Sequence, residues 1–224
     1  CVIHEDFDAK YSPHLEYYTI RNQLITLATQ GKKGVLNGIL RLAKVSAKHL
    51  FLYRYDLMPL IFKAFEDFLQ GASLLLNSDE ERLNREIISL APKAKPLSEL
   101  DGWRDELRAP YEPKGRCFFS KLFQVLTLGG HLIPSFMLKK KISAFPLPNA
   151  KVGSAYLRKR TIQYQLGSDF GYAYNRSVRS FFKWFFKCFS LSFKLLFKYG
   201  KAKRSFKNSK ELLTSEAFWK KHLN

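Results

Sequence analysis

The chain has 224 residues, a hydrophobic content of 46% and a formal net charge of +19. It is long enough to bury a core in one or two domains, and its hydrophobic content excludes a wholly disordered chain. The charge is uneven: residues 1–112 hold 15 Lys and Arg against 16 Asp and Glu, whereas residues 113–224 hold 23 against 3. We therefore expect the second half to attract an anionic partner: nucleic acid, anionic lipid or a phosphate-bearing substrate.

The first residues hold the densest group of reactive side chains in the chain. His4 lies beside the carboxylates of Glu5, Asp6 and Asp8, and such a loop can ligate a divalent metal or move a proton. The alternative is a solvated acidic turn in which His4 has no chemical role. The sequence begins at Cys1 with no Met and no charged, then apolar leader, so we expect a fragment boundary and no signal peptide.

Helical patterns occupy residues 13–91. Ser12 is a favourable N-cap and Pro13 suits the first helical position, so a helix is predicted over 13–30. Apolar spacing predicts three more helices, over 35–53, 57–70 and 80–91. The first helix is expected to bury one set of side chains: Leu15, Tyr18, Leu24, Ile25 and Ala28.

Two polar groups in this helical region are candidate functional residues. Arg21 lies four residues after Tyr17 and three after Tyr18, so all three side chains can share one patch on the helix. The acidic pair at 66–67 could also be functional, but a solvated face or an ion pair with Lys63 accounts for it without a function.

A Pro-rich connection covers residues 92–116, and a short helix is predicted inside it over Leu97–Leu107. Residues 117–175 then contain strand-like runs with Gly, Pro and Asn between them, at Ile142–Phe145, Ala155–Leu157 and Thr161–Leu166. These runs predict a small antiparallel β region. In the predicted strand Thr161–Leu166, Ile162 belongs to the face that should be buried. His131 follows a Gly pair and is interpreted either as a functional His or as a buried, hydrogen-bonded one.

Residues 176–224 are predicted to form basic, amphipathic helices: a long one over 176–201 and a short closing one over Glu211–His222. Over 176–201 the polar side chains, mostly Lys and Arg, recur every three or four residues among many Phe and Leu. No run of about 18 residues lacks charge, which argues against a membrane-spanning helix. A helix of this composition suits the membrane interface, with its cations on anionic headgroups. The expected membrane-binding residues are Arg179, Lys183, Lys187, Lys194, Lys198, Trp184 and Phe185.

Two alternatives remain for this basic region. Its aromatic face could pack on residues 117–175, which would leave the cationic stripe exposed to solvent without a binding role. Packing and membrane binding can also occur together, each using part of the aromatic face. The chain could also be a non-catalytic basic module that binds a membrane or nucleic acid. We expect no nucleic acid, because the sequence has no nucleic-acid motif and the aromatics of 181–199 follow a helical phase.

Four stretches together resemble one enzyme family. They are HEDFDAKYS at 4–12, YYTIRN at 17–22, LTLGGHLIP at 126–134 and LTSEAFW at 213–219. In order and spacing they are similar to the C-terminal region of galactofuranosyltransferase-like members of glycosyltransferase family 2. The resemblance implies that residues 1–12 are the tail end of a GT-A catalytic domain that is otherwise missing. The expected fold is mainly α: a helical bundle, then a small antiparallel β element, then long basic and aromatic helices.

The same resemblance implies the chemistry of the parent enzyme. His4 matches the family's His that helps to hold a divalent metal, Mn or Mg, on the donor diphosphate. No catalytic residue is expected within this chain, because the family's catalytic base and Asp-X-Asp motif lie upstream. The parent would be an inverting, metal-dependent transferase using a UDP-sugar donor, such as UDP-galactofuranose, and a lipid-linked glycan acceptor. The fragment alone is expected to be inactive. Because Tyr17, Tyr18 and Arg21 lie close in sequence to His4, we expect them to line the acceptor side of that active site or to support it from behind by packing.

The expected location follows from these partners. A lipid-linked acceptor and a basic helix place the protein peripherally on the cytoplasmic face of the cell membrane, against an anionic surface. Three cysteines without metal-ligand spacing fit that reducing side. Family members assemble into oligomers, so a homo-oligomer is an open expectation.

Overall fold

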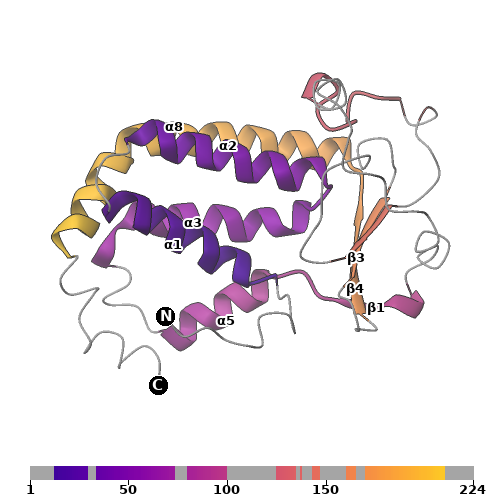
Figure 1. The fold of residues 1–224 in the computed structure, drawn as a ribbon, viewed down its shortest axis with the longest axis horizontal. Helices are drawn as coiled ribbons and strands as arrows, with labels where there is room; N and C mark the ends of the chain where they lie inside the picture. The colour runs from indigo at the N-terminus through magenta and orange to yellow at the C-terminus, as the bar shows by residue number, and fades with distance from the viewer. Residues whose placement is uncertain are drawn as a thin grey trace. The chain divides into compact units, whose positions relative to one another are not determined.

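A computed structural model of the chain describes residues 13–29, 34–73, 80–99, 125–134, 137, 143–146, 160–164 and 170–209 (Figure 1). The fold is mainly α with a small sheet, as predicted. It forms two compact units. The helical unit comprises the described parts of Pro13–Ser46, Leu57–Ala91 and the chain from Phe186 onward. The sheet unit comprises those of Ala47–Asp56 and Pro92–Phe185, so both units are assembled from separate segments.

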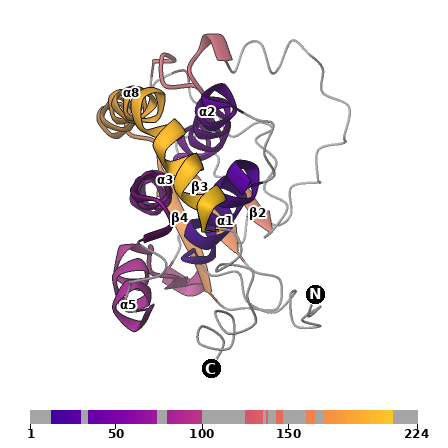
Figure 2. The same ribbon diagram turned by 90° about the vertical axis from the view of Figure 1, so that its left-hand side faces the viewer.

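The five α-helices of the described chain correspond to the predicted ones. They are α1 (Leu15–Thr29), α2 (Val35–Phe51), α3 (Met58–Gln70), α5 (Glu80–Leu90) and α8 (Val178–Asn208). Within the helical unit, α1 and α5 both contact α3. The part of α8 in this unit runs beside α2 (Figures 1 and 2). Gly38 permits this approach, because a Cβ there would lie 2.9 Å from a ring carbon of Tyr199.

Helix α3 is the centre of the helical unit. Pro59 lies in its first turn, where a missing N–H is tolerated, and its predicted apolar face is fully buried. The face consists of Leu60, Ile61, Ala64, Phe65 and Phe68. The helix ends at Gly71, whose φ of +87° favours a residue without a side chain.

The buried face of helix α1 agrees with the predicted one at Leu24 and Ala28 and differs from it at the other positions. The buried residues are Tyr17, Ile20, Leu24 and Ala28, which follow one another at steps of three and four. Leu15, which was expected inside, is 42% exposed. The phase of the helix is set by Tyr17, whose hydroxyl donates a hydrogen bond to the Asp67 carboxylate on α3.

The sheet unit contains four short strands in the order β1-β4-β3-β2. They are β1 (Lys95–Pro96), β2 (Ser143–Pro146), β3 (Arg160–Tyr164) and β4 (Phe170–Asn175). Strand β4 pairs antiparallel with both β1 and β3, and Ile162 of β3, opposite Ala173, is buried as predicted. Strand β2 pairs parallel with β3, so the expectation of a purely antiparallel element was wrong at this edge.

Some predicted segments extend past the described residues. Of the short helix predicted over Leu97–Leu107, the structure describes a single 3₁₀ turn at Leu97–Glu99. The predicted strand Ala155–Leu157 and the closing helix Glu211–His222 lie outside the described residues. At the other end of the basic region, α8 continues past the predicted limit at 201 to Asn208.

Candidate functional site

In the helical unit, α8 is anchored by one of its sides. The buried residues of that side recur at steps of three and four: Leu191, Leu195, Tyr199, Ala202 and Phe206. The Phe68 ring of α3 lies 5.4 Å from the rings of both Tyr199 and Phe206, and it is nearly parallel to the second. This core contact fixes the rotation of α8 about its own axis, and so it decides which side chains face outward.

A second side of the same helix is apolar and exposed. We call it the apolar face, and it consists of Phe186, Phe189, Phe193, Leu196 and Phe197. At about 100° per residue, these positions occupy a sector roughly 100° wide. Phe197 is 82% exposed, and the Phe189 and Phe193 rings meet edge to face at 5.0 Å. An exposed group of large apolar side chains on one side of a helix indicates a surface for a partner or a membrane.

A third side of α8 is cationic and lies next to the apolar face. We call it the lysine row: Lys187, Lys194, Lys198 and Lys201, all of them exposed. These positions occupy a sector roughly 60° wide at about 100° per residue. Lys194 forms an ion pair with Glu66 of α3, with 3.0 Å between Nζ and Oε1. The helix is thus divided lengthwise into a core side, an aromatic side and a cationic side.

The expected membrane-binding residues lie on α8 as follows. Arg179, Lys183, Lys187, Lys194 and Lys198 are all exposed. Phe185 is 44% exposed and Trp184 is half-buried, with the Lys183 ammonium 5.6 Å from the Trp184 ring centre. In the sheet unit, Phe181 is buried and stacks on His131, so the packing alternative holds for that ring.

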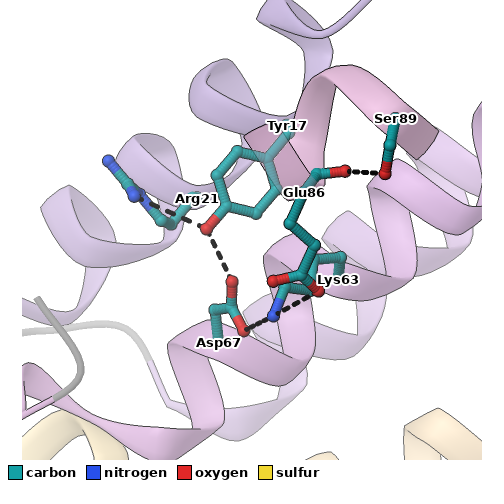
Figure 3. A network of polar contacts seen from close by, with 6 residues as sticks. All are labelled: Tyr17, Arg21, Lys63, Asp67, Glu86 and Ser89. Atoms are coloured by element: carbon teal, nitrogen blue, oxygen red, sulfur yellow. Dashed lines mark hydrogen bonds and ion pairs between the residues drawn. The ribbon is translucent and has the colours of Figure 1, made fainter. Parts of the chain in front are cut away.

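Two residues of the predicted Tyr and Arg patch, Tyr17 and Arg21, come together in a polar network that joins three helices (Figure 3). The Tyr17 hydroxyl donates to Asp67 Oδ2 at 2.6 Å. Lys63 Nζ lies 3.1 Å from Asp67 Oδ1 and 3.1 Å from Glu86 Oε1. Arg21 Nη1 donates to the Tyr17 oxygen at 3.5 Å. The acidic residue at 67 is therefore paired with Lys63, as one of the sequence interpretations had it.

Burial governs the protonation of this network. Burial raises the pKa of Tyr17, and the hydrogen bond to Asp67 raises it further, so the phenol stays protonated. For Lys63, burial lowers the pKa, but the hydrogen bonds and charges of Asp67 and Glu86 outweigh burial and the net shift is upward. The buried Asp67 side chain thus has a hydrogen-bond donor on one side and a cation on the other, as a buried carboxylate requires.

The other two patch residues lie at the edge of this network. The Arg21 guanidinium lies 5.3 Å from the Tyr17 ring centre and 5.1 Å from that of Tyr18. The Tyr18 hydroxyl donates to Asn84 Oδ1 of α5. Tyr17 is fully buried, so its place in the structure fits a buttressing role better than contact with an acceptor.

His131 is a buried, hydrogen-bonded residue of the sheet unit. Its Nδ1 lies 2.6 Å from the Leu128 carbonyl oxygen, which can only accept, so Nδ1 carries the proton. Its Nε2 then accepts from the Tyr55 hydroxyl. Burial lowers the pKa of His131 to about 4, and the nearby Arg176 acts in the same direction, while the bond to Leu128 opposes them. Of the two interpretations of His131, its burial and its two hydrogen bonds fit that of a buried structural residue.

Arg176 also holds the turn that contains His131. Arg176 Nη2 donates to the carbonyl oxygens of His131 and Ile133, at 2.8 and 2.7 Å. Gly129 lies beside Phe51, where a Cβ would come within 2.5 Å of a ring carbon. Gly129 is therefore required by packing, and both Gly129 and Gly130 have positive φ angles, which favour glycine.

Comparison with known proteins adds no relative. No model of a known protein family matches the sequence, and no curated protein matches it. The glycosyltransferase interpretation therefore remains a proposal that rests on the resemblance of the four stretches.

The expected metal ligand lies outside the part of the chain that the structure describes. His4 is outside the described residues, and so is the acidic cluster beside it. Within the described ranges, no three His, Cys, Asp or Glu side chains gather as a metal site would require. In the same ranges, no helix combines the length and apolar character needed to cross a bilayer. The candidate site that the structure itself describes is therefore the outer surface of α8.

Proposed function

We propose that this chain binds an anionic membrane surface through the apolar face and the lysine row of α8. The observation that carries the proposal is the division of one helix into a core side, an exposed aromatic side and an adjacent cationic side. A helix lying in the plane of a membrane needs this arrangement, because its apolar side chains enter the acyl boundary while its cations stay at headgroup level.

The energetics of such binding are favourable. Transfer of one exposed Phe side chain out of water contributes about 1.5–3 kcal/mol, and each Lys near an anionic surface adds about 1 kcal/mol. The apolar face and the lysine row offer several of each. Single-stranded nucleic acid would instead need aromatic rings spaced as platforms for successive bases. Here the rings crowd along one side of a helix, and Phe189 and Phe193 contact each other.

The test is binding to vesicles of phosphatidylcholine with rising phosphatidylglycerol content, measured by co-sedimentation. We expect binding that grows with anionic content and weakens with salt. Phe193→Ser with Phe197→Ser should reduce affinity by about 100-fold, since two rings are lost from the interface. Lys187→Glu with Lys198→Glu should reduce it by at least about 25-fold.

Matched controls separate this surface from net charge alone. Lys44→Glu with Lys93→Glu makes the same charge change at two exposed positions outside α8. If that pair weakens binding as much as the lysine-row pair, the lysine row is not the binding surface. Preference for an oligonucleotide over every vesicle, or burial of the apolar face in a stable dimer measured by analytical ultracentrifugation, would also contradict the proposal.

We further propose that the membrane-bound protein is the C-terminal part of a metal-dependent, inverting glycosyltransferase. The support is the resemblance of the four stretches, His4 among them. The parent would transfer a sugar, such as galactofuranose from UDP-galactofuranose, to a lipid-linked glycan at the cytoplasmic membrane face. A surface that holds the enzyme beside a lipid-linked acceptor fits that task.

The enzymatic proposal has its own test. In the parent enzyme, His4→Ala should strongly weaken Mn- or Mg-dependent transfer from the UDP-sugar, because one metal ligand is lost. His14→Ala is the matched control, since it removes the same side chain ten residues later. Residues 1–224 alone should show no transfer. Unchanged metal dependence in the His4 variant would remove His4 from the metal site.

A further inference from the structure

We infer that Glu66 acts as an intramolecular competitor of anionic lipid for the lysine row, so that it sets how much anionic lipid the surface must contain before the protein binds. This inference rests on the proposed membrane function. The observation behind it is the ion pair between Glu66 Oε1 and Lys194 Nζ, 3.0 Å apart. Lys194 lies in the middle of the lysine row, so the competing charge is inside the binding surface.

The position of Glu66 is fixed by the core. Two residues further along α3, Phe68 packs against Tyr199 and Phe206 of α8. Near the end of α3, the Ala72 N–H donates to Ser205 Oγ at 3.0 Å. These contacts hold α3 along α8, and they keep the Glu66 carboxylate within reach of Lys194 without help from a ligand. The pair is therefore formed before any membrane arrives.

The strength of the pair suits competition. Both side chains are about half exposed, at 45% for Glu66 and 51% for Lys194. Exposed ion pairs of this kind are weak and screened by salt, so they shift an equilibrium by less than about fivefold. A surface dense in anionic headgroups can displace Glu66 from Lys194, whereas a sparse one cannot. The expected result is a steeper dependence of binding on anionic lipid content.

The neighbouring acid does not share this role. Asp67 is buried, faces α1 and is engaged by Tyr17 and Lys63. Glu86 is paired with Lys63 as well. Adjacent residues of α3 therefore contact different helices: Asp67 joins α3 to α1, and Glu66 reaches α8.

The experiment compares Glu66→Gln with the wild-type chain on phosphatidylcholine vesicles of graded phosphatidylglycerol content. Gln keeps the size of the side chain and removes its charge. We expect about three- to fivefold tighter binding at low anionic content and a smaller gain at high content. The matched control is Glu81→Gln, which makes the same charge change on α5, where Glu81 pairs with the exposed Arg85.

A second background tests whether Glu66 acts through Lys194. In a Lys194→Gln chain, Glu66→Gln should change affinity less than it does in the wild-type chain, because the cation that Glu66 neutralises is absent. An equal gain in both backgrounds would identify Glu66 as an ordinary repulsive charge and overturn the inference. So would an equal gain from Glu81→Gln.

The two proposals fail in different ways. If the wild-type chain and the Glu66→Gln chain bind vesicles with equal affinity at every lipid composition, the competitor role is wrong and the membrane function stands. If neither chain binds any vesicle, both proposals are wrong. If only Glu66→Gln binds, the carboxylate is a stronger competitor than inferred, and the inference is supported.

Discussion

Glu66 and Asp67 are consecutive acids on one helix, yet they belong to regions with opposite properties. Around Asp67, the buried carboxylate is engaged by the buried Tyr17 phenol of α1 and by the partly buried Lys63, which also pairs with the half-exposed Glu86 of α5. Around Glu66, the charges of α3 and α8 are half exposed and paired only across the surface. Buried polar groups are costly to separate, whereas exposed ones exchange partners easily. The first region therefore stabilises the fold, and the second is available to a partner.

The variant expected to separate the two regions most clearly is Asp67→Ala. It leaves the Tyr17 hydroxyl without its acceptor and Lys63 without its buried carboxylate. We expect the free energy of unfolding to fall by about 3–5 kcal/mol, measured by urea denaturation. The neighbouring Glu66→Ala is the control and should cost less than about 1 kcal/mol. Equal losses from the two variants would contradict the division between the regions.

A second buried group, His131 of the sheet unit, predicts a pH dependence. Its pKa is lowered to about 4 in the folded chain from an ordinary value near 6.5. Between these values the unfolded chain binds a proton that the folded chain does not, so stability falls as pH drops from about 6.5 to 4. The expected loss is about 3 kcal/mol.

This prediction is checked by urea midpoints measured across that pH range. His131→Gln should reduce the slope between about pH 6.5 and 4 relative to the wild-type chain, because one of the groups that take up a proton on unfolding is gone, while the buried His49, whose pKa burial also lowers, remains. A variant with the wild-type slope would show that another group governs the acid response.

Tyr17→Phe should have a smaller effect than Asp67→Ala. It removes one hydrogen-bond donor but keeps the ring that α1 buries, and Lys63 still neutralises Asp67. We expect a loss of about 1–2 kcal/mol in the free energy of unfolding. Tyr18→Phe, which loses only a partly buried bond to Asn84, serves as the comparison. A loss as large as that of Asp67→Ala would mean that the hydroxyl, and not the ion pair, holds the network together.

The smallest effect on stability is expected on the apolar face. Phe193→Ser and Phe197→Ser replace exposed rings, so each should change the free energy of unfolding by less than about 0.5 kcal/mol, apart from a small change in helix propensity. The measurement is the same urea denaturation, with the buried Phe68→Ser as a contrasting variant expected to cost several times more. Substantial destabilisation by Phe197→Ser would indicate that the apolar face is part of the core.

The parts of the fold that sequence predicts well are those governed by local pattern. Helix α3 has a clear apolar stripe, a Pro in its first turn and a Gly at its end, and all three behave as expected. The phase of α1 was predicted wrongly in its first turn, where Leu15 was expected inside but Tyr17 is the buried residue. Its burial depends on Asp67, fifty residues away in the sequence, and no local pattern reveals that partner.

The same division applies to α8 and to the sheet. The helix continues past residue 201 because Ala202 and Phe206 extend the buried stripe that Tyr199 belongs to, and the many Lys residues there conceal this continuation. The spacing of the lysine row was readable from the sequence, but its partner Glu66, 128 residues away, was not. The parallel pairing of β2 with β3 likewise depends on the path of the chain and not on the composition of either strand.

The contact between Ala72 and Ser205 has a consequence for the order in which the chain folds. The hydroxyl that receives the Ala72 N–H is made 133 residues later. At about 5–20 residues per second, a ribosome needs roughly 7 to 27 s to reach it. During that interval Phe68 has no Phe206 to stack on, so an aromatic side chain of α3 stays exposed on the nascent chain. Completion of the helical unit is therefore a late, non-local step in the synthesis of the chain.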